Sequence, residues 1–354
     1  MSGATPLVVM TRRCGCLPRR LPPSRVPAVP RVLPVLFAAV LGCAVLPAAA
    51  VPAAAEGQGR TFVAVSVATV WTSPDSPRPR DRAAVATPAD PAGWLGSMSS
   101  EDRRELTTAS RTQTQVLLGA PVTVTARRDG WAQIVVPGQP SAKDHRGYPG
   151  WVPEAQLVDD PAFGALAAGA PAGTVDDVAT TWLYRDPART ERLREISVGT
   201  RLPVVGEAGD AVRVALPGGD QAWTAAETLR PGAPPSPTGE GLVATARLFL
   251  DRPYLWGGRS GFGPDCSGLT GLAYALHGIT VGRDASDQSR GGRPVGDPAD
   301  LRPGDLLFWN SPATHVAMYA GGGRMIEAFD AATPVRVTPV RFDATYSGAR
   351  RYLP

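Results

Sequence analysis

Between Thr61 and Leu229 the chain repeats itself once, and this repeat limits the fold more than any other feature of the sequence. Each copy consists of short runs rich in Val and Thr that are bounded by Gly, Pro and Asp, a pattern typical of small β-barrels. We therefore expect two barrels, over residues 61–160 and 173–231. Three pairs of segments carry the repeat: Val67–Trp71 with Val178–Trp182, Gly119 and Pro137-Gly138 with Gly199 and Pro217-Gly218, and Trp151–Leu157 with Trp223–Leu229.

The first copy is longer than the second because of an insertion, roughly residues 90–112, whose Ser-Ser-Glu-Asp segment is typical of a helix start. Two stretches rich in Pro and small residues, 163–173 and 232–240, are interpreted as linkers. A last domain then spans residues 241–354, and its first helix is expected over 242–250.

Residues 1–55 have the order of a signal peptide: six arginines and no acid, an apolar run over 32–46, and three alanines at 53–55. Pro34 and Pro47 leave too short an apolar stretch for a membrane span. A lipoprotein site at Cys43 is the weaker alternative, because apolar residues continue beyond it. We therefore expect a secreted or cell-wall protein without a stable membrane anchor.

Removal of this segment changes the charge balance. Of 36 basic residues 30 remain, against 32 acidic ones, so the mature chain is near neutral and its charge gives no reason to expect nucleic acid as a partner. Three of the four cysteines are removed as well, which leaves Cys266. An unpaired thiol in an oxidising compartment is a liability unless it is used, so Cys266 is predicted to be a nucleophile rather than a buried structural cysteine.

Cys266 is predicted to lie at a helix start. Leu269, Leu272, Ala273 and Leu276 recur at i, i+3, i+4 and i+7, whereas the preceding Gly-Phe-Gly-Pro cannot extend a helix backwards. At a helix N-terminus the unpaired N–H groups and the macrodipole favour a thiolate over a thiol.

Of the three histidines, His315 is the best candidate for a base. His277 is interpreted as a helix C-cap where a cation suits the dipole, and His145 lies in a polar loop. Two strands, 315–319 and 324–329, are predicted to form a hairpin about three glycines. If Tyr319 pairs with Met325, the period of two brings His315 and Glu327 onto one face, although Glu327 could also be a solvated strand residue.

At these residues the chain resembles the NlpC/P60 family of papain-like cysteine peptidases, with four matching motifs. They are Tyr-x-Trp-Gly-Gly from Tyr254, Asp-Cys-Ser-Gly-Leu from Asp265, Arg-Pro-Gly-Asp-Leu from Arg302, and His-Val-x-x-Tyr from His315. The resemblance implies an α+β fold: a papain-like catalytic domain, with helices packed on a small antiparallel sheet, preceded by two bacterial SH3-like barrels. It implies a γ-D-glutamyl-L-diamino acid endopeptidase that acts on peptidoglycan stem peptides.

In this resemblance Cys266 attacks the γ-carbonyl, His315 transfers the proton, and Glu327, at a position commonly histidine in relatives, holds the imidazole. Asp265 would bind the free amine of an N-terminal L-alanine. Gln113 stands where similar members of the family have an acid, and a neutral amide there weakens the preference for that amine. The positions that match the family's substrate pocket are Tyr254, Trp256, Asp265, Ser267, Tyr148 and Gln113.

Two other functions compete with this one. A wall-binding protein could hold peptidoglycan with its barrels and carry an inert C-terminal domain, and an amidase or acyltransferase could use the same Cys266–His315 pair on another acyl donor. The remaining cysteine and the scattered histidines fit no zinc spacing, so neither a metal nor another cofactor is expected.

Overall fold

The computed structural model describes residues 61–354, so the predicted signal peptide lies outside the described residues. None of the helices in residues 61–354 has the length and apolar character of a membrane span.

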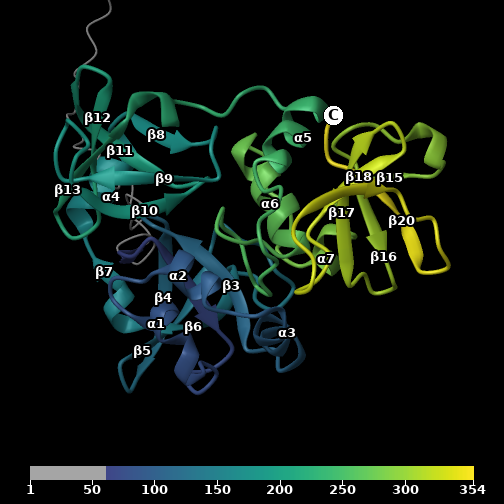
Figure 1. The fold of residues 1–354 in the computed structure, drawn as a ribbon, viewed down its shortest axis with the longest axis horizontal. Coiled ribbons are helices and arrows are strands. Elements are labelled where there is room, and N and C mark those ends of the chain that lie inside the picture. The colour runs from purple at the N-terminus through teal and green to yellow at the C-terminus, as the bar shows by residue number, and fades with distance from the viewer. Residues whose placement is uncertain (1–60) are drawn as a thin grey trace, which may run out of the picture. The chain divides into compact units, whose positions relative to one another are not determined.

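Two seven-stranded sheets form the barrels, and they share one topology (Figure 1). The first has the order β3-β2-β6-β5-β4-β1-β7 and the second the order β10-β9-β13-β12-β11-β8-β14, so each strand of the first has its counterpart seven strands later. The repeat is therefore confirmed as a repeat of structure. The strands are β1 (Thr61–Val63), β2 (Val67–Trp71), β3 (Thr112–Leu117), β4 (Pro121–Arg128), β5 (Trp131–Val136), β6 (Tyr148–Pro153), β7 (Leu157–Asp159), β8 (Ala172–Val175), β9 (Thr180–Tyr184), β10 (Arg192–Ser197), β11 (Arg201–Ala208), β12 (Ala211–Ala215), β13 (Gln221–Ala225) and β14 (Leu229–Pro231).

One part of the predicted alignment was wrong by two residues. Trp71 pairs with Trp151 in the first barrel, whereas Tyr184 pairs with Trp223 in the second. The counterpart of Trp71 is therefore Tyr184 and not Trp182. A shift of two residues keeps every side chain on the same face of a strand, so the polar pattern alone could not reveal it.

The insertion lies between β2 and β3 and is helical, as expected, but it starts earlier than residue 90. It contains η1 (Pro79–Asp81), α1 (Arg82–Val85), α2 (Pro91–Gly96) and α3 (Ser100–Thr108). Ser99 caps α3 in a capping box with Asp102, as the sequence predicts. Trp94 and Leu106 are fully buried, so the helices belong to the packed body.

Residues 163–173 do not form a linker. Helix α4 (Pro161–Gly169) begins behind the Asp160 cap, and Phe163 packs edge-on against Phe62 with ring centroids 5.0 Å apart. The alanines and glycines of α4 show no helical periodicity, so the sequence pattern did not predict this helix. The second predicted linker ends sooner than expected, because Thr238 caps α5 (Gly239–Arg247) and starts it three residues before Leu242.

The last domain packs helices on an antiparallel sheet of order β15-β20-β16-β17-β18-β19. Helix α6 (Cys266–Leu276) lies between α5 and β17, and its leucines enter the main core of this domain. This arrangement confirms the predicted α+β fold (Figure 1). The remaining elements are α7 (Ala285–Gln288), β15 (Arg293–Val295), η4 (Pro298–Asp300), β16 (Leu306–Trp309), β17 (His315–Gly321), β18 (Arg324–Glu327), β19 (Arg336–Pro339) and β20 (Tyr346–Arg351).

Candidate active site

Cys266 is the first residue of α6, as the leucine spacing predicted. Asp265 caps the helix, and its Oδ1 accepts a hydrogen bond from the backbone N–H of Gly268 at 2.6 Å. The cysteine is free and only 6 % exposed. The sulfur is therefore carried by the first residue of the helix, at the end of the macrodipole where negative charge is favoured.

His315 comes from β17, and its hairpin partner is the strand that carries Glu327. Tyr319 pairs with Met325, which is the predicted register. The imidazole Nε2 lies 3.0 Å from Oε2 of Glu327, so the two side chains share a face as expected. Burial lowers the pKa of His315, but hydrogen bonds and charge interactions with Cys266 and Glu327 outweigh it and raise that pKa to about 9.

Glu327 is fully buried, which excludes a solvated strand residue. Its Oε1 accepts from Arg336 Nη2 at 3.1 Å, and Arg341 binds both oxygens at 2.9 Å. Burial raises the pKa of Glu327, but His315 and Arg341 hold it down at about 2. Glu327 is thus ionised at neutral pH beside His315.

Two aromatic rings pack against the imidazole. The ring centroids of Trp309 and Phe329 each lie 5.3 Å from that of His315. The guanidinium of Arg341 lies 4.9 Å from both aromatic centroids. These contacts fix the orientation of the ring that the glutamate holds.

Asp265 has a different environment from the one predicted for an amine ligand. Arg283 donates to both of its oxygens, at 3.1 and 2.8 Å, and the same carboxylate caps α6. Ser267 donates to Asp265 at 3.2 Å and accepts from Arg283 at 3.0 Å. The carboxylate is thus already neutralised inside the protein. An aspartate directly before a helix is a common N-cap, so the local signal for this role was present.

The carboxylate that contacts Tyr148 is Asp284, which the sequence reasoning missed. Tyr148 is buried, and its hydroxyl donates to the two oxygens of Asp284 at 2.8 and 3.1 Å. Burial and the negative charge of Asp284 raise the pKa of Tyr148, so the phenol stays neutral. Asp284 directly follows Arg283, and neither residue is marked by a local pattern.

Strand β3 of the first barrel lies against the cysteine loop. Thr112 Oγ1 donates to the carbonyl of Trp256 at 2.5 Å, and Arg283 Nε donates to Thr114 Oγ1 at 2.7 Å. Gln113 lies between these two contacts on the same strand. Tyr254 is buried beside the cysteine, and burial and the charge of Cys266 raise its pKa. The predicted pocket residues thus lie on the cysteine loop, at the start of α6, on β3 and, for Tyr148, on β6, and their contact with substrate stays a prediction.

The two remaining histidines lie elsewhere. His277 is the C-cap of α6, as predicted, but burial lowers its pKa and its Nε2 lies 3.0 Å from Thr245 Oγ1. The expected dipole-bound cation is therefore not favoured. His145 is exposed in the loop before β6.

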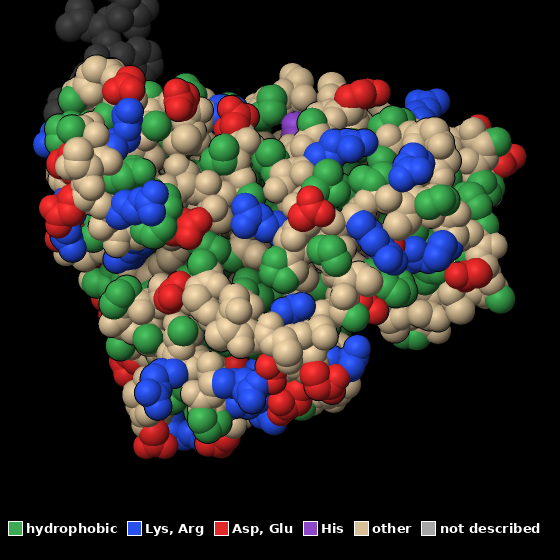
Figure 2. Space-filling view, viewed as in Figure 1, with side chains coloured by type: hydrophobic (Ala, Val, Ile, Leu, Met, Phe, Trp, Pro, Cys, Tyr) green, Lys and Arg blue, Asp and Glu red, His purple; other side chains and the backbone are tan. Residues whose placement is uncertain are grey.

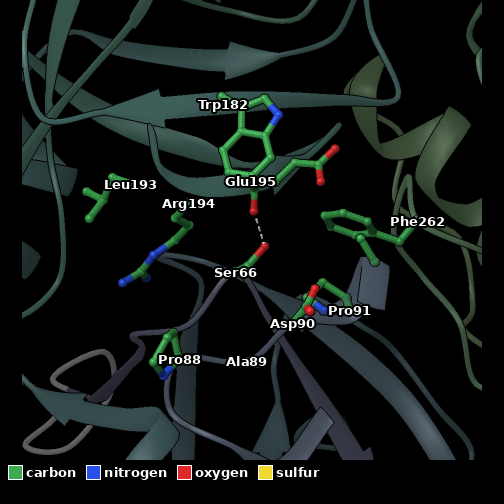
Figure 3. Close-up of a pocket in the computed structure, with 11 residues that line it drawn as sticks. Ser66, Pro88, Ala89, Asp90, Pro91, Trp182, Leu193, Arg194, Glu195 and Phe262 are labelled. Carbon is green, nitrogen blue, oxygen red and sulfur yellow. Dashed lines mark hydrogen bonds between the residues drawn. The ribbon is translucent and has the colours of Figure 1, made fainter. Parts of the chain in front are cut away.

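A small pocket of about 170 Å³ lies away from Cys266, where the two barrels meet Phe262 (Figure 3). Ser66 donates to the carbonyl of Glu195 there, so this pocket marks the contact between the barrels. On the face drawn in Figure 2, acidic and basic side chains are interspersed. That face therefore presents no extended surface of one charge.

Comparison with known protein families gives three matches in order along the chain. The model described as the NlpC/P60 family matches residues 251–350. The YKFC SH3b2 domain matches residues 177–229, and the bacterial dipeptidyl-peptidase Sh3 domain matches residues 103–157. Both barrels and the catalytic region thus have recognised counterparts.

Several known proteins are similar to this chain over most of its length. A γ-D-glutamyl-L-lysine dipeptidyl-peptidase of Bacillus cereus is 40 % identical over 83 % of this chain and 91 % of its own length. One of Bacillus subtilis with the same name is 37 % identical over 75 % and 88 %. A crystal structure of an NlpC/P60 family protein from Bacillus cereus has 38 % identity and a TM-score of 0.77, covering 83 % of this chain and 99 % of that one.

Proposed function

Because the chain belongs to the NlpC/P60 family of cysteine peptidases, we propose that it hydrolyses the bond between D-γ-glutamate and the diamino acid of peptidoglycan stem peptides. The observation that supports this proposal most is the line Cys266–His315–Glu327, with the nucleophile at a helix start and the imidazole bound to a buried carboxylate. The names of the two Bacillus relatives supply the bond and the substrate class.

The raised pKa of His315, about 9, keeps the ring protonated at neutral pH, so the ring can pair with the thiolate form of Cys266 that attacks the substrate. The thiolate attacks the γ-carbonyl carbon, and the carbonyl π electrons move to the oxygen. His315 then gives its proton to the leaving nitrogen of the diamino acid, which leaves a thioester. The neutral ring next takes a proton from water, and the resulting hydroxide attacks the thioester and releases the acid.

Glu327 keeps the imidazole in one orientation throughout and stabilises its cation. Backbone N–H groups at the start of α6 are suitably placed for the oxyanion of both tetrahedral intermediates, a contribution of about 3 kcal/mol per donor in enzymes of this kind. Export to the cell wall is part of the proposal, because the intact substrate lies there and residues 1–55 have the composition of a signal peptide.

Mass spectrometry of products from defined tripeptides tests this function. L-Ala-γ-D-Glu linked to L-lysine or to meso-diaminopimelate should yield L-Ala-D-Glu and the free diamino acid. The matched control is the isomer joined through the α-carboxyl group of the glutamate, which should remain intact. Cys266→Ala protein, in which the nucleophile is absent, should leave every peptide intact. Cleavage at another bond, or of none, would refute the proposal.

A further inference from the structure

Lys143 is the only lysine among the 354 residues, whereas the other 35 basic residues are arginines. It lies in the loop between β5 and β6 of the first barrel. The loop is attached to the catalytic domain, since the carbonyl of Pro140 accepts from the backbone N–H of Arg283 at 2.9 Å, and Asp287 accepts from that of Ala142 at 3.4 Å. The lysine is thereby held over the site.

Three side chains surround the ammonium of Lys143, and we refer to Gln113, Tyr148 and Asp284 as the ammonium cage. Lys143 Nζ donates to Gln113 Oε1 at 2.6 Å and to the Tyr148 hydroxyl, and it lies 3.7 Å from Asp284 Oδ2. It also lies 4.4 Å from the centroid of the Tyr148 ring. The lysine side chain remains 42 % exposed, so it covers the cage from the solvent side.

The cage is built to present acceptors. The amide nitrogen of Gln113 donates to Thr72 Oγ1 at 2.7 Å, so its oxygen faces Lys143. Tyr148 gives its hydroxyl hydrogen to Asp284, so the lone pairs of its oxygen are free for the ammonium. Acceptor oxygens and an aromatic face around one point are the chemistry that binds a primary ammonium.

The cage lies close to the reacting sulfur. The guanidinium of Arg283 lies 6.0 Å from the Tyr148 ring centroid and binds Asp265, which directly precedes Cys266. The L-Ala-D-Glu part of a bound stem peptide lies on the acyl side of the scissile bond, and two residues span about 7 Å. We therefore place the nitrogen of the alanine toward the cage.

The charges in the cage already balance. Gln113 is neutral, Tyr148 is neutral, and the carboxylate of Asp284 is matched by the ammonium of Lys143. A second ammonium would lack a counterion and would compete with a tethered one, whose effective concentration is in the millimolar range or above. An amide nitrogen carries no charge and has neither disadvantage.

We propose that Lys143 occupies the cage as a built-in ammonium and competes with a free N-terminal amine, so that this protein cleaves stem peptides with a free alanine nitrogen but prefers those whose alanine nitrogen is acylated. This inference rests on the proposed function, and it makes Lys143 a specificity-determining residue. It also predicts that a carboxylate at position 113 alone cannot restore amine binding, because that carboxylate would pair with Lys143.

The test is the ratio of kcat/KM for the free and the N-acetylated tripeptide, L-Ala-γ-D-Glu-diamino acid. Wild type should prefer the acetylated peptide. Lys143→Met should move the ratio about tenfold toward the free amine, through KM, because it removes one charge-assisted contact. Gln113→Glu alone should leave the ratio unchanged, whereas the double variant should favour the free amine most.

Arg146→Met is the matched control. This variant also removes one positive charge from the loop that carries Lys143. Within residues 61–354, however, the side chain of Arg146 bonds only to Asp144 and does not contact the cage. The ratio should not move in this variant. The Kd values of the free and the acetylated peptide should also be measured with each variant in the Cys266→Ala background, which binds but does not cleave. The ratio of these Kd values should rank the variants in the same order as the ratio of kcat/KM.

A wild type that prefers the free amine, or a ratio that Lys143→Met leaves unchanged, would overturn the inference. Failure of the proposed function is a different result, since then neither peptide is cleaved by any variant.

Discussion

Glu327→Gln probes the charge of the buried acid without changing its shape. The amide can still accept a hydrogen bond from His315 Nε2, but it no longer stabilises the imidazolium. Arg336 and Arg341, which now bind the carboxylate, lose their counterion and add positive charge beside the ring. Both effects lower the pKa of His315.

The structure sets the scale of the change. The pKa of His315 is about 9 against an ordinary 6.5, so a return to the ordinary value is a fall of about 2.5 pH units, or about 3.4 kcal/mol. Cys266 retains part of the raised pKa, whereas burial and the two unpaired arginines oppose it, so we expect a loss of kcat/KM at neutral pH on the order of 300-fold. Because the pKa of His315 is raised, its ring stays protonated at neutral pH in wild type and loses its proton as the pH rises through about 9.

The assay is kcat/KM against pH for the γ-linked tripeptide, together with an NMR titration of His315. The alkaline limb of the profile should begin near pH 9 in wild type and at a lower pH in Glu327→Gln. Arg336→Gln is the control, because it removes a positive charge beside Glu327 instead of a negative one. It should not shift the alkaline limb of the profile to lower pH. If both variants lower the limb equally, the cause is loosened packing; if neither moves it, Glu327 is a bystander.

Three further outcomes are expected. Cys266→Ala should reduce turnover below about a thousandth of wild type with an unchanged circular dichroism spectrum, since alanine fits a helix start but cannot attack a carbonyl. Arg283→Met should lower the free energy of urea unfolding by about 3 to 5 kcal/mol, because it leaves a buried carboxylate unpaired, whereas Arg290→Met at an exposed pair should cost less than about 1 kcal/mol. Gly257→Ala should raise KM more than Gly130→Ala does, because both glycines have positive φ but a Cβ on Gly257 would meet β3 at 3.1 Å, whereas at Gly130 it would meet open space.

Local patterns in the sequence predicted the three elements that carry the reacting groups. The leucine spacing located α6, and the glycines at 321–323 gave the register that joins His315 to Glu327. Each of these features depends on residues fewer than about fifteen positions apart, so periodicity and turn chemistry suffice.

The residues that surround those reacting groups could not be predicted from local sequence patterns. Arg336 and Arg341 reach Glu327 from β19 and the segment after it, and nothing local distinguishes them from the other arginines. Asp284 and Lys143 come from different domains, and their proximity depends on how the barrel packs on α7. Asp265 was assigned to the substrate because its competing partner, Arg283, is found only through tertiary contact.

The contact between β3 and the cysteine loop joins the first barrel to the catalytic domain. Thr112, Thr114 and Gln115 each bond to the catalytic domain, and Gly257 lets the two backbones approach closely. The bonds of Thr112 and Thr114, on either side of Gln113, fix the position of Gln113 relative to the cysteine loop. A barrel that only tethered the enzyme to the wall would need none of these bonds. Under the proposed function the first barrel forms one wall of the substrate site, and we expect a substitution at position 113 to change specificity without touching Cys266 or His315.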